Sequence, residues 1–402
     1  MNAQKKQQDG MHRHLPAPGR LRSVPARPAL FAVLFLSVAA ILPAEALGSP
    51  DWGYALDLPE GYVLAERSGN DRYHFTHNLF PAELQIALYP TGQFKTAGEA
   101  LSWVTKQLAS TGTEADFTWR YRSAAIARLE FGASAGWALS VELAGGKGSL
   151  VMACFAPAER ATELEPLIVS TLDAVFTDNG AYFCPGPMTA FAWPAEGASN
   201  ARYRDADLDF EVPFDSSDTA ANQSVVDREF SLLTAYLDTP RVYDAWKRYY
   251  RMIARDGWSR LAKASFNIGT RLPADSAELS ARLLAWTQSF SYERKLDGSD
   301  FISLPGAFAS RTGDCDSRAL LLVTVLNELG VDAILLVSPE YSHALAAIDC
   351  PGKGARYAFG GKEYLIADTT AKVDIGLIAG DMADPSKWFA VSFYAFPHAD
   401  QK

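Results

Sequence analysis

The stretch "RTGDCDSRALLLVTVLNELG", residues 311 to 330, decides the fold of the C-terminal half of the chain. Its apolar residues cover most of a helical circumference, which predicts a central buried helix that ends at Gly330. Cys315 stands in the first turn, after Asp314, the expected N-cap, and before Asp316. Free backbone N–H groups and the helix dipole favour a thiolate there, whereas the two carboxylates oppose it. The end position indicates a reactive cysteine, and a small buried cysteine that simply fits is the alternative.

Three strands are predicted after this helix. Their sequences are "VDAILLVS" (331–338), "SHALAAID" (342–349) and "KEYLIADTT" (362–370). His343, one of only six histidines, begins the second strand, and Asp368 ends the third. This order of cysteine, histidine and aspartate allows the arrangement of a thiol enzyme. The imidazole removes the thiol proton, and the carboxylate orients the imidazole and stabilises its charged form.

A metal site is an alternative to this thiol chemistry. Its ligands would be Cys315, His343, Cys350 and Asp368. Alternation along the second strand puts His343 on one face and Cys350 on the other, and the chain has no C-x-x-C pair. The acidic run 205–211 lacks the glycine of an EF-hand loop, and an amphipathic strand with Leu208, Phe210 and Val212 inward explains it better. We therefore expect no metal and no cofactor.

Residues 275 to 375 resemble the transglutaminase-like superfamily, which has a papain-like core. The resemblance rests on "GDCDSRALLLVTVLNELGVDAILL", "SHALAAI" and "YLIADTT". It implies Cys315 as nucleophile, His343 as general base and Asp368 as its orienter. Many members have an aromatic residue where this chain has Leu345. "WTQSFSYE" resembles a glutamine-containing stretch of bacterial members, which makes Gln288 a candidate oxyanion donor, with an ordinary solvated glutamine as the alternative.

Residues 52 to 178 predict a separate, largely antiparallel sheet with helices. Alternating segments indicate strands at 72–77, 83–89, 115–121, 125–131, 137–143 and 149–157, and helices are expected at 96–110 and 159–176. The opening "ALDLPEGYVLAE" and the closing "STLDAVF" resemble the PsbP-like domain, an α/β sandwich. This resemblance carries no catalytic residue, so the domain is expected to have an accessory or binding role.

The whole chain has 402 residues, 48% of them hydrophobic, so two or more domains are expected. Residues 185–222 are rich in turn residues and predict the boundary, after which residues 224 to 290 have a helical period. Trp246, Tyr249, Tyr250 and Trp258 of this helical part are expected in the core, with a binding groove as the alternative. The fold class is therefore α+β, with a PsbP-like domain at 52–178 and a helical segment plus transglutaminase-like domain at 224–402.

The first 46 residues have the pattern of a secretory signal peptide. Six basic residues precede the apolar run 29–42, and Ala44 and Ala46 offer a cleavage site. An uncleaved anchor is the alternative. The remaining chain has a net charge of −14, which argues against nucleic acid as a partner. We expect an exported protein, periplasmic or extracellular, without a membrane span after cleavage. Four cysteines are too few for a disulfide framework, although Cys154 and Cys184 could pair.

Two functions remain open at this point. The favoured one is an exported cysteine-dependent enzyme, a transglutaminase-like peptidase, amidase or acyl transferase, that attacks an amide bond of a protein or peptide, cell-envelope substrates included. The alternative is a binding or scaffolding protein that keeps the same core without turnover. Neither the substrate nor the choice between hydrolysis and transamidation follows from the sequence.

Overall fold

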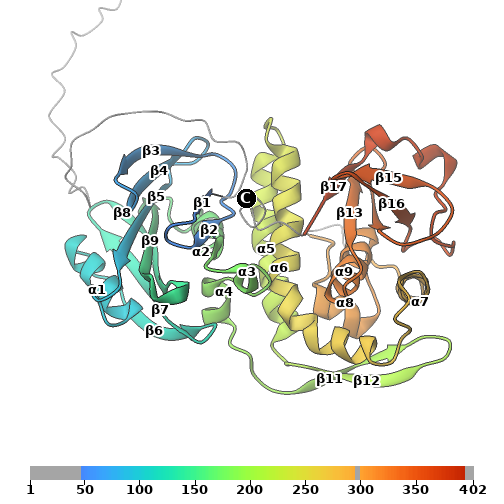
Figure 1. Cartoon of the computed structure of the whole chain (residues 1–402). Coiled ribbons are helices and arrows are strands. Elements are labelled where there is room, and N and C mark those ends of the chain that lie inside the picture. The colour runs from blue at the N-terminus through green and yellow to red at the C-terminus, as the bar shows by residue number, and fades with distance from the viewer. Residues whose placement is uncertain (1–46, 295–298, 394–402) are drawn as a thin grey trace, which may run out of the picture. The chain divides into compact units, whose positions relative to one another are not determined.

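The computed structural model describes residues 47–294 and 299–393, so the expected signal peptide lies outside the described residues. Within these ranges the chain folds into nine α-helices and several sheets whose strands pair antiparallel (Figure 1). The predicted α+β fold class is confirmed. The predicted domain boundaries stay a prediction, as does independent folding of residues 52 to 178.

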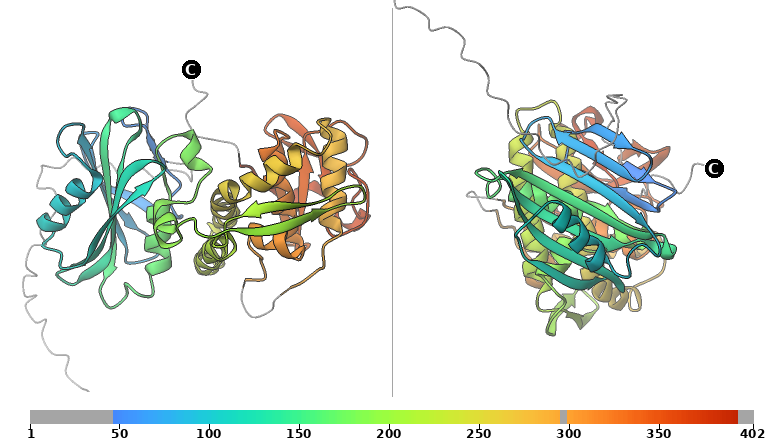
Figure 2. Two further views of the ribbon diagram at one scale, coloured as in Figure 1. Left: turned by 90° about the horizontal axis from the view of Figure 1, so that it is seen from below. Right: turned by 90° about the vertical axis from the view of Figure 1, so that its left-hand side faces the viewer.

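The N-terminal part is built on a seven-stranded antiparallel sheet with the order β3-β4-β5-β9-β8-β7-β6 (Figure 2, right). Its strands are β3 (Tyr62–Ser68), β4 (Arg72–His77), β5 (Glu83–Pro90), β6 (Glu114–Trp119), β7 (Arg122–Phe131), β8 (Ser134–Glu142) and β9 (Gly148–Pro157). The six strands predicted from alternation lie where they were expected. Helix α1 (Ala97–Gln107) packs on β7 and β8 and begins after its N-cap Thr96, whose hydroxyl accepts a hydrogen bond from the Glu99 N–H at 3.1 Å.

The helix predicted at 159–176 is shorter in the structure, and this part of the prediction is wrong. Helix α2 spans Glu165–Asp173 with a proline in its first turn, and residues 175–176 form β10 (Val175–Phe176). Together with β1 (Leu47–Ser49) and β2 (Tyr54–Leu56), β10 makes a small three-stranded sheet. Backbone pairing with β2 therefore takes the last residues out of the helix.

The predicted boundary segment contains regular structure. Helices α3 (Asn179–Tyr182) and α4 (Pro187–Ala192) precede a hairpin of β11 (Ser199–Arg204) and β12 (Asp209–Phe214). Phe210 and Val212 alternate with exposed neighbours, so the amphipathic strand is confirmed, although Leu208 lies in the turn. The Asp205 side chain accepts hydrogen bonds from two backbone N–H groups of that turn and pairs with Arg282. The hairpin packs on α6 and α8 (Figure 2, left).

The helical segment consists of α5 (Asp218–Tyr236), α6 (Val242–Gly269) and α7 (Ser276–Gln288). The long helices α5 and α6 lie side by side (Figure 1). Helix α6 runs through Gly257 without a break. A Cβ atom at this position would lie 2.8 Å from the Leu304 side chain, so glycine here allows close packing rather than ending the helix.

The C-terminal part is a five-stranded antiparallel sheet with the order β15-β16-β14-β13-β17. Its strands are β13 (Ala333–Ser338), β14 (His343–Ile348), β15 (Arg356–Phe359), β16 (Lys362–Ala367) and β17 (Phe389–Val391). Helix α9 (Cys315–Glu328) packs on β13 and β14, and α8 (Leu304–Ser310) packs on α9. Twelve of the fourteen residues of α9 are buried, as its sequence predicted.

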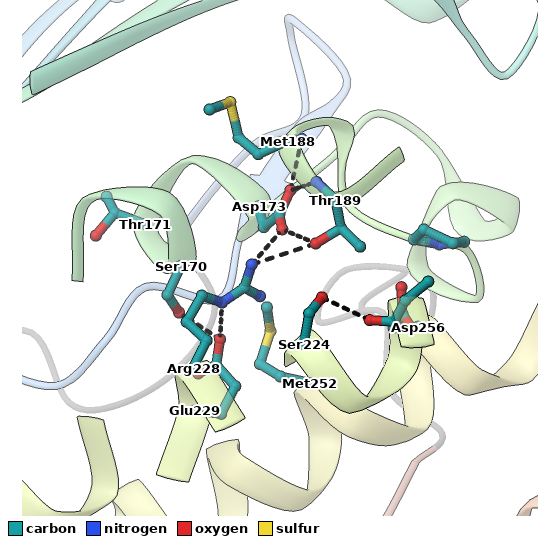
Figure 3. Close-up of polar contacts among 12 residues, drawn as sticks. Ser170, Thr171, Asp173, Met188, Thr189, Ser224, Arg228, Glu229, Met252 and Asp256 are labelled. Carbon is teal, nitrogen blue, oxygen red and sulfur yellow. Dashed lines mark hydrogen bonds and ion pairs between the residues drawn. The ribbon is translucent and has the colours of Figure 1, made fainter. Parts of the chain in front are cut away.

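A buried polar network joins α2 to α5 and α6 (Figure 3). The Glu229 carboxylate accepts hydrogen bonds from the Ser170 hydroxyl and from the guanidinium groups of Arg228 and Arg248, all within 2.7 to 2.9 Å. Arg228 also donates to the Asp173 carboxylate at 2.7 Å, and Asp173 accepts the backbone N–H groups at the start of α4. Each of these charges has an opposite partner, which offsets the cost of burying it.

The described residues show the state of the four cysteines. All four cysteines lie within these ranges, and all are free thiols, so Cys154 and Cys184 do not pair. The Cys154 sulfur instead lies 3.4 Å from the Tyr62 hydroxyl inside the N-terminal sheet. Among the described helices, none combines the length and the apolar character that crossing a membrane requires.

Candidate functional site

Helix α9 begins at Cys315 because Asp314 caps it. The Asp314 backbone is extended, with ψ at −171°, and its carboxylate accepts a hydrogen bond from the Ser317 N–H at 2.8 Å. The predicted N-cap is therefore confirmed. The Arg318 guanidinium, one turn further on, donates to the carbonyls of Gly313 and Thr369. These bonds tie the start of α9 to the segment that follows β16.

The Cys315 thiol is 8% exposed and donates a hydrogen bond to Asp316 Oδ1 at 3.1 Å. The Tyr250 hydroxyl donates to the other oxygen of the same carboxylate. Burial and the two neighbouring carboxylates hold the pKa of the Cys315 thiol well above its usual range, although the Ala344 backbone N–H opposes this shift. In this arrangement the thiol keeps its proton, because the carboxylates outweigh the helix dipole.

Asp314 and Asp316 are themselves affected by this crowding. Burial and the neighbouring Asp316 carboxylate raise the pKa of Asp314 to about 7. Burial also raises the pKa of Asp316, against the hydrogen bonds that Tyr250 and Cys315 donate to it. Each of the two carboxyl groups therefore releases its proton less readily than an isolated one. They and the Cys315 sulfur lie within 4.8 Å of one another.

His343 and Asp368 form the second part of the site. His343 Nε2 lies 3.4 Å from Asp368 Oδ2, a loose hydrogen bond that leaves Nδ1 for another partner. Asp368 Oδ1 accepts hydrogen bonds from the Thr370 N–H, the Thr370 hydroxyl and the Ala371 N–H. Burial alone would raise the pKa of Asp368, but the bonds from His343 and Thr370 lower it to about 2. A carboxylate fixed in this way can orient an imidazole.

Gln288, the last residue of α7, contacts the strand end that carries Asp368. Its side-chain Nε2 donates to the Asp368 carbonyl at 2.9 Å and to the Val373 carbonyl at 2.8 Å. Both N–H groups of the amide are therefore engaged with backbone. In this geometry the side chain holds the Asp368 turn in place, and it would act as an oxyanion donor only after one of these bonds had broken. The oxyanion role stays a prediction.

The structure brings His343, Asp368 and Gln288 together and places Cys315 beside the same strand. The Cys315 sulfur faces the backbone N–H of Ala344, the residue after His343. Cys315 packs in one cluster with Ala344 and Ala346, whereas Leu345 packs in a second cluster with Trp388. The His343 ring lies 6.3 Å from the Trp388 ring, on the side of the second cluster. Among the described residues no hydrogen bond joins the Cys315 thiol to His343.

The predicted alternation along β14 is confirmed by these clusters. Cys350 packs with Cys315 in the first cluster, on the face opposite Leu345 and Ala347. Cys350 therefore lies on the other face of the strand from His343, as the alternation of the sequence predicted. Tyr249 and Tyr250 are buried in the core, and the Tyr250 hydroxyl reaches Asp316.

Sequence reasoning missed two members of the site. Tyr250 was expected in the core, with a binding groove as the alternative, and its hydrogen bond to the residue after Cys315 was not predicted. Trp388 precedes the three-residue strand β17, and no periodicity marks it. Asp316 was recognised as a charge that opposes thiolate formation, but its hydrogen bond with the thiol was not predicted.

Comparisons with known proteins found distant structural similarities. No protein-family model and no curated protein matches this chain. The solution structure of cyanobacterial PsbP (CyanoP) from Synechocystis sp. PCC 6803 is similar at a TM-score of 0.29 and 10% identity, over 35% of this chain and 97% of that one. The crystal structure of red sea bream transglutaminase is similar at a TM-score of 0.17 and 10% identity, over 74% of this chain and 48% of that one. Similarities this distant assign no activity to the chain.

Proposed function

We propose that this protein is a cysteine-dependent enzyme that attacks an amide bond of a protein or peptide and passes the acyl group to water or to an amine. Cys315 is the nucleophile, His343 the general base and Asp368 the residue that orients His343. The observation that carries the proposal is the start of β14. There α9, whose first residue is Cys315, packs on β14, and His343, the first residue of β14, is held by Asp368 at 3.4 Å.

The proposed reaction has two steps. In the first, the Cys315 sulfur bonds to the carbonyl carbon while His343 takes the thiol proton and delivers it to the departing amine. In the second step, His343 takes a proton from water or an amine, and this molecule attacks the acyl carbon. The carbon–sulfur bond then breaks, and His343 returns the proton to the sulfur, which restores the thiol. The first step requires the thiol to turn from Asp316 towards His343, because the proton now lies in the bond to Asp316. Apo geometry of this kind is often loose.

A non-catalytic binding protein is the second candidate, and a specific observation favours it. The Cys315 thiol donates to Asp316, and the pKa of this thiol is raised. If that bond persists with substrate present, the core binds without turnover. The two functions differ in whether Cys315 reacts near neutral pH.

Replacing His343 by alanine is expected to slow labelling of Cys315 near neutral pH. The label is a thiol-reactive electrophile carried on a capped peptide amide, and its rate is followed by mass spectrometry of the intact protein. Without its base the thiol stays protonated, so the rate falls about 10²- to 10⁴-fold. Asp368→Asn should reduce the rate less, because asparagine keeps an acceptor for Thr370 while losing the charge that faces the imidazole.

The matched control is His74→Ala. His74 Nε2 also contacts a carboxylate, Glu83 Oε2 at 3.1 Å, but in the N-terminal sheet. This variant loses the same kind of pair and should label at the unchanged rate. Equal labelling rates for wild type and His343→Ala would contradict the proposed enzyme and favour the binding protein.

Export is a further proposal, and it rests on the sequence of residues 1–46. N-terminal sequencing of protein recovered outside the cytoplasm should begin near Leu47 or Ser49, because Ala44 and Ala46 provide small residues before the cut. A recovered protein that begins before Ala29 would instead indicate the uncleaved anchor.

A further inference from the structure

A cavity of about 570 Å³ opens on the His343–Asp368 pair. Besides these two residues, its wall includes Tyr341 before β14 and the segment that follows β16. Apolar side chains dominate this wall, among them Ala371, Val373, Leu377, Ile378 and Met382. A volume in this range holds a group larger than one side chain.

Four polar residues of the wall, Ser342, His343, Asp368 and Thr370, already make hydrogen bonds within the protein. His343 and Asp368 bind each other, and the Thr370 hydroxyl donates to Asp368 at 2.7 Å. Ser342 Oγ faces the Pro339 carbonyl at 3.5 Å. A charged group that entered would lose its hydration without gaining an opposite charge, since the only charged member of the described wall, Asp368, is fixed by four hydrogen bonds.

Leu377 adds a second observation. This side chain is 52% exposed although it faces the cavity, so a large apolar surface stands open to water beside the reactive pair. Tyr341, another residue of the wall, packs on Trp388 with ring centroids 5.6 Å apart, and the Trp388 ring also lies 6.3 Å from the His343 ring. An apolar group seated here would cover Leu377 and lie against the imidazole.

We infer that this cavity selects substrates by an uncharged, apolar side chain of a peptide, next to the amide that reacts. The inference rests on the proposed function, because the His343–Asp368 pair makes this cavity part of the reactive site. The cavity lies on the His343 side and Cys315 does not line it. The apolar side chain therefore belongs to the part of the substrate that exchanges protons with His343, the departing or the accepting amine.

The test measures binding without turnover, on the full chain with Cys315→Ala. The probe is a capped tripeptide with leucine on both sides of a central alanine, and its twin has asparagine, which is nearly the same size, in place of leucine. Calorimetry should give the leucine peptide an affinity at least about tenfold higher than its twin, since asparagine would leave buried polar groups unpaired.

A second substitution locates the binding. Adding Leu377→Asp should weaken binding of the leucine peptide about tenfold, because it puts a charge into the apolar wall. The matched control is Leu237→Asp, since Leu237 is also exposed, at 50%, and lies at the end of α5 outside the cavity. It should leave the affinity unchanged.

The outcomes separate this inference from the proposed function. Equal affinities for the two peptides, binding of neither peptide, or an unchanged affinity in Leu377→Asp would overturn the inference, even if wild-type Cys315 is labelled by the electrophile. Preferential binding together with an unlabelled wild-type Cys315 would support an apolar peptide site and reject the enzyme.

Discussion

Replacing Cys315 by alanine is expected to abolish labelling by the peptide-amide electrophile while the protein stays folded. The reaction needs a sulfur at the start of α9, and alanine removes it. The side chain lies at a helix end and loses only one heavy atom, so cooperative melting should persist. Mass spectrometry of digested wild-type protein should find the label on the peptide that contains Cys315 and on no other cysteine peptide.

Cys350→Ala is the matched control for this substitution. Cys350 is also a free, buried thiol, 5% exposed, and it packs in the same cluster as Cys315. It follows the end of β14 opposite to His343, seven residues further along the chain, so its removal should leave the labelling rate unchanged. A Cys315→Ala protein that is still labelled at the wild-type rate would show that another thiol reacts, and the proposed nucleophile would be wrong.

Sequence periodicity was sufficient for the elements that bury one face. Six of the seven strands of the N-terminal sheet and helix α9 were predicted because alternation and helical spacing report burial directly, whereas β3 was not predicted. The hairpin of β15 and β16 was only half predicted. Its turn at Gly360 and Gly361, both with positive φ, is a hairpin signal that could have located β15 as well.

Tertiary contacts determined the parts that the sequence could not predict. Residues 175–176 leave α2 because they pair with β2, and α6 continues through Gly257 because Leu304 packs against it. Propensity alone assigns the first to a helix and the second to a helix end. Packing overrides both preferences, and the packing partners lie more than forty residues away in sequence.

In the candidate site, too, the sequence predicted some features, and tertiary contacts determined the others. The order of Cys315, His343 and Asp368 along the chain predicted the arrangement of a thiol enzyme. The structure pairs His343 with Asp368, and the triad as a whole stays a prediction. The hydrogen bond of the Cys315 thiol with Asp316 was not predictable, because it depends on Tyr250, which reaches Asp316 from α6. The sequence likewise could not show that the side-chain amide of Gln288 donates hydrogen bonds to two backbone carbonyls. Which donors remain available depends on side-chain orientation, which periodicity does not encode.

Replacing Glu229 by alanine is expected to cause the largest loss of stability. Glu229 is 2% exposed. Its carboxylate pairs with Arg228 (Figure 3) and at the same time with Arg248. Without it Arg248 loses its charged partner, and Arg228 keeps only Asp173. Removing one partner of a buried ion pair costs about 3–5 kcal/mol. Urea denaturation followed by circular dichroism should show this decrease in the free energy of unfolding.

Two further variants separate lost charge from lost packing. Glu229→Gln keeps the size of the side chain but turns an N–H group towards a guanidinium, so it should lose less stability than alanine and still be clearly destabilised. Glu163→Ala removes a carboxylate that pairs with Arg160 at 2.6 Å on the surface, where water solvates both charges, and should change stability little. If Glu229→Ala were as stable as Glu163→Ala, water would have to reach the guanidinium groups, and the network joining α2 to α5 and α6 would contribute no more than a surface ion pair.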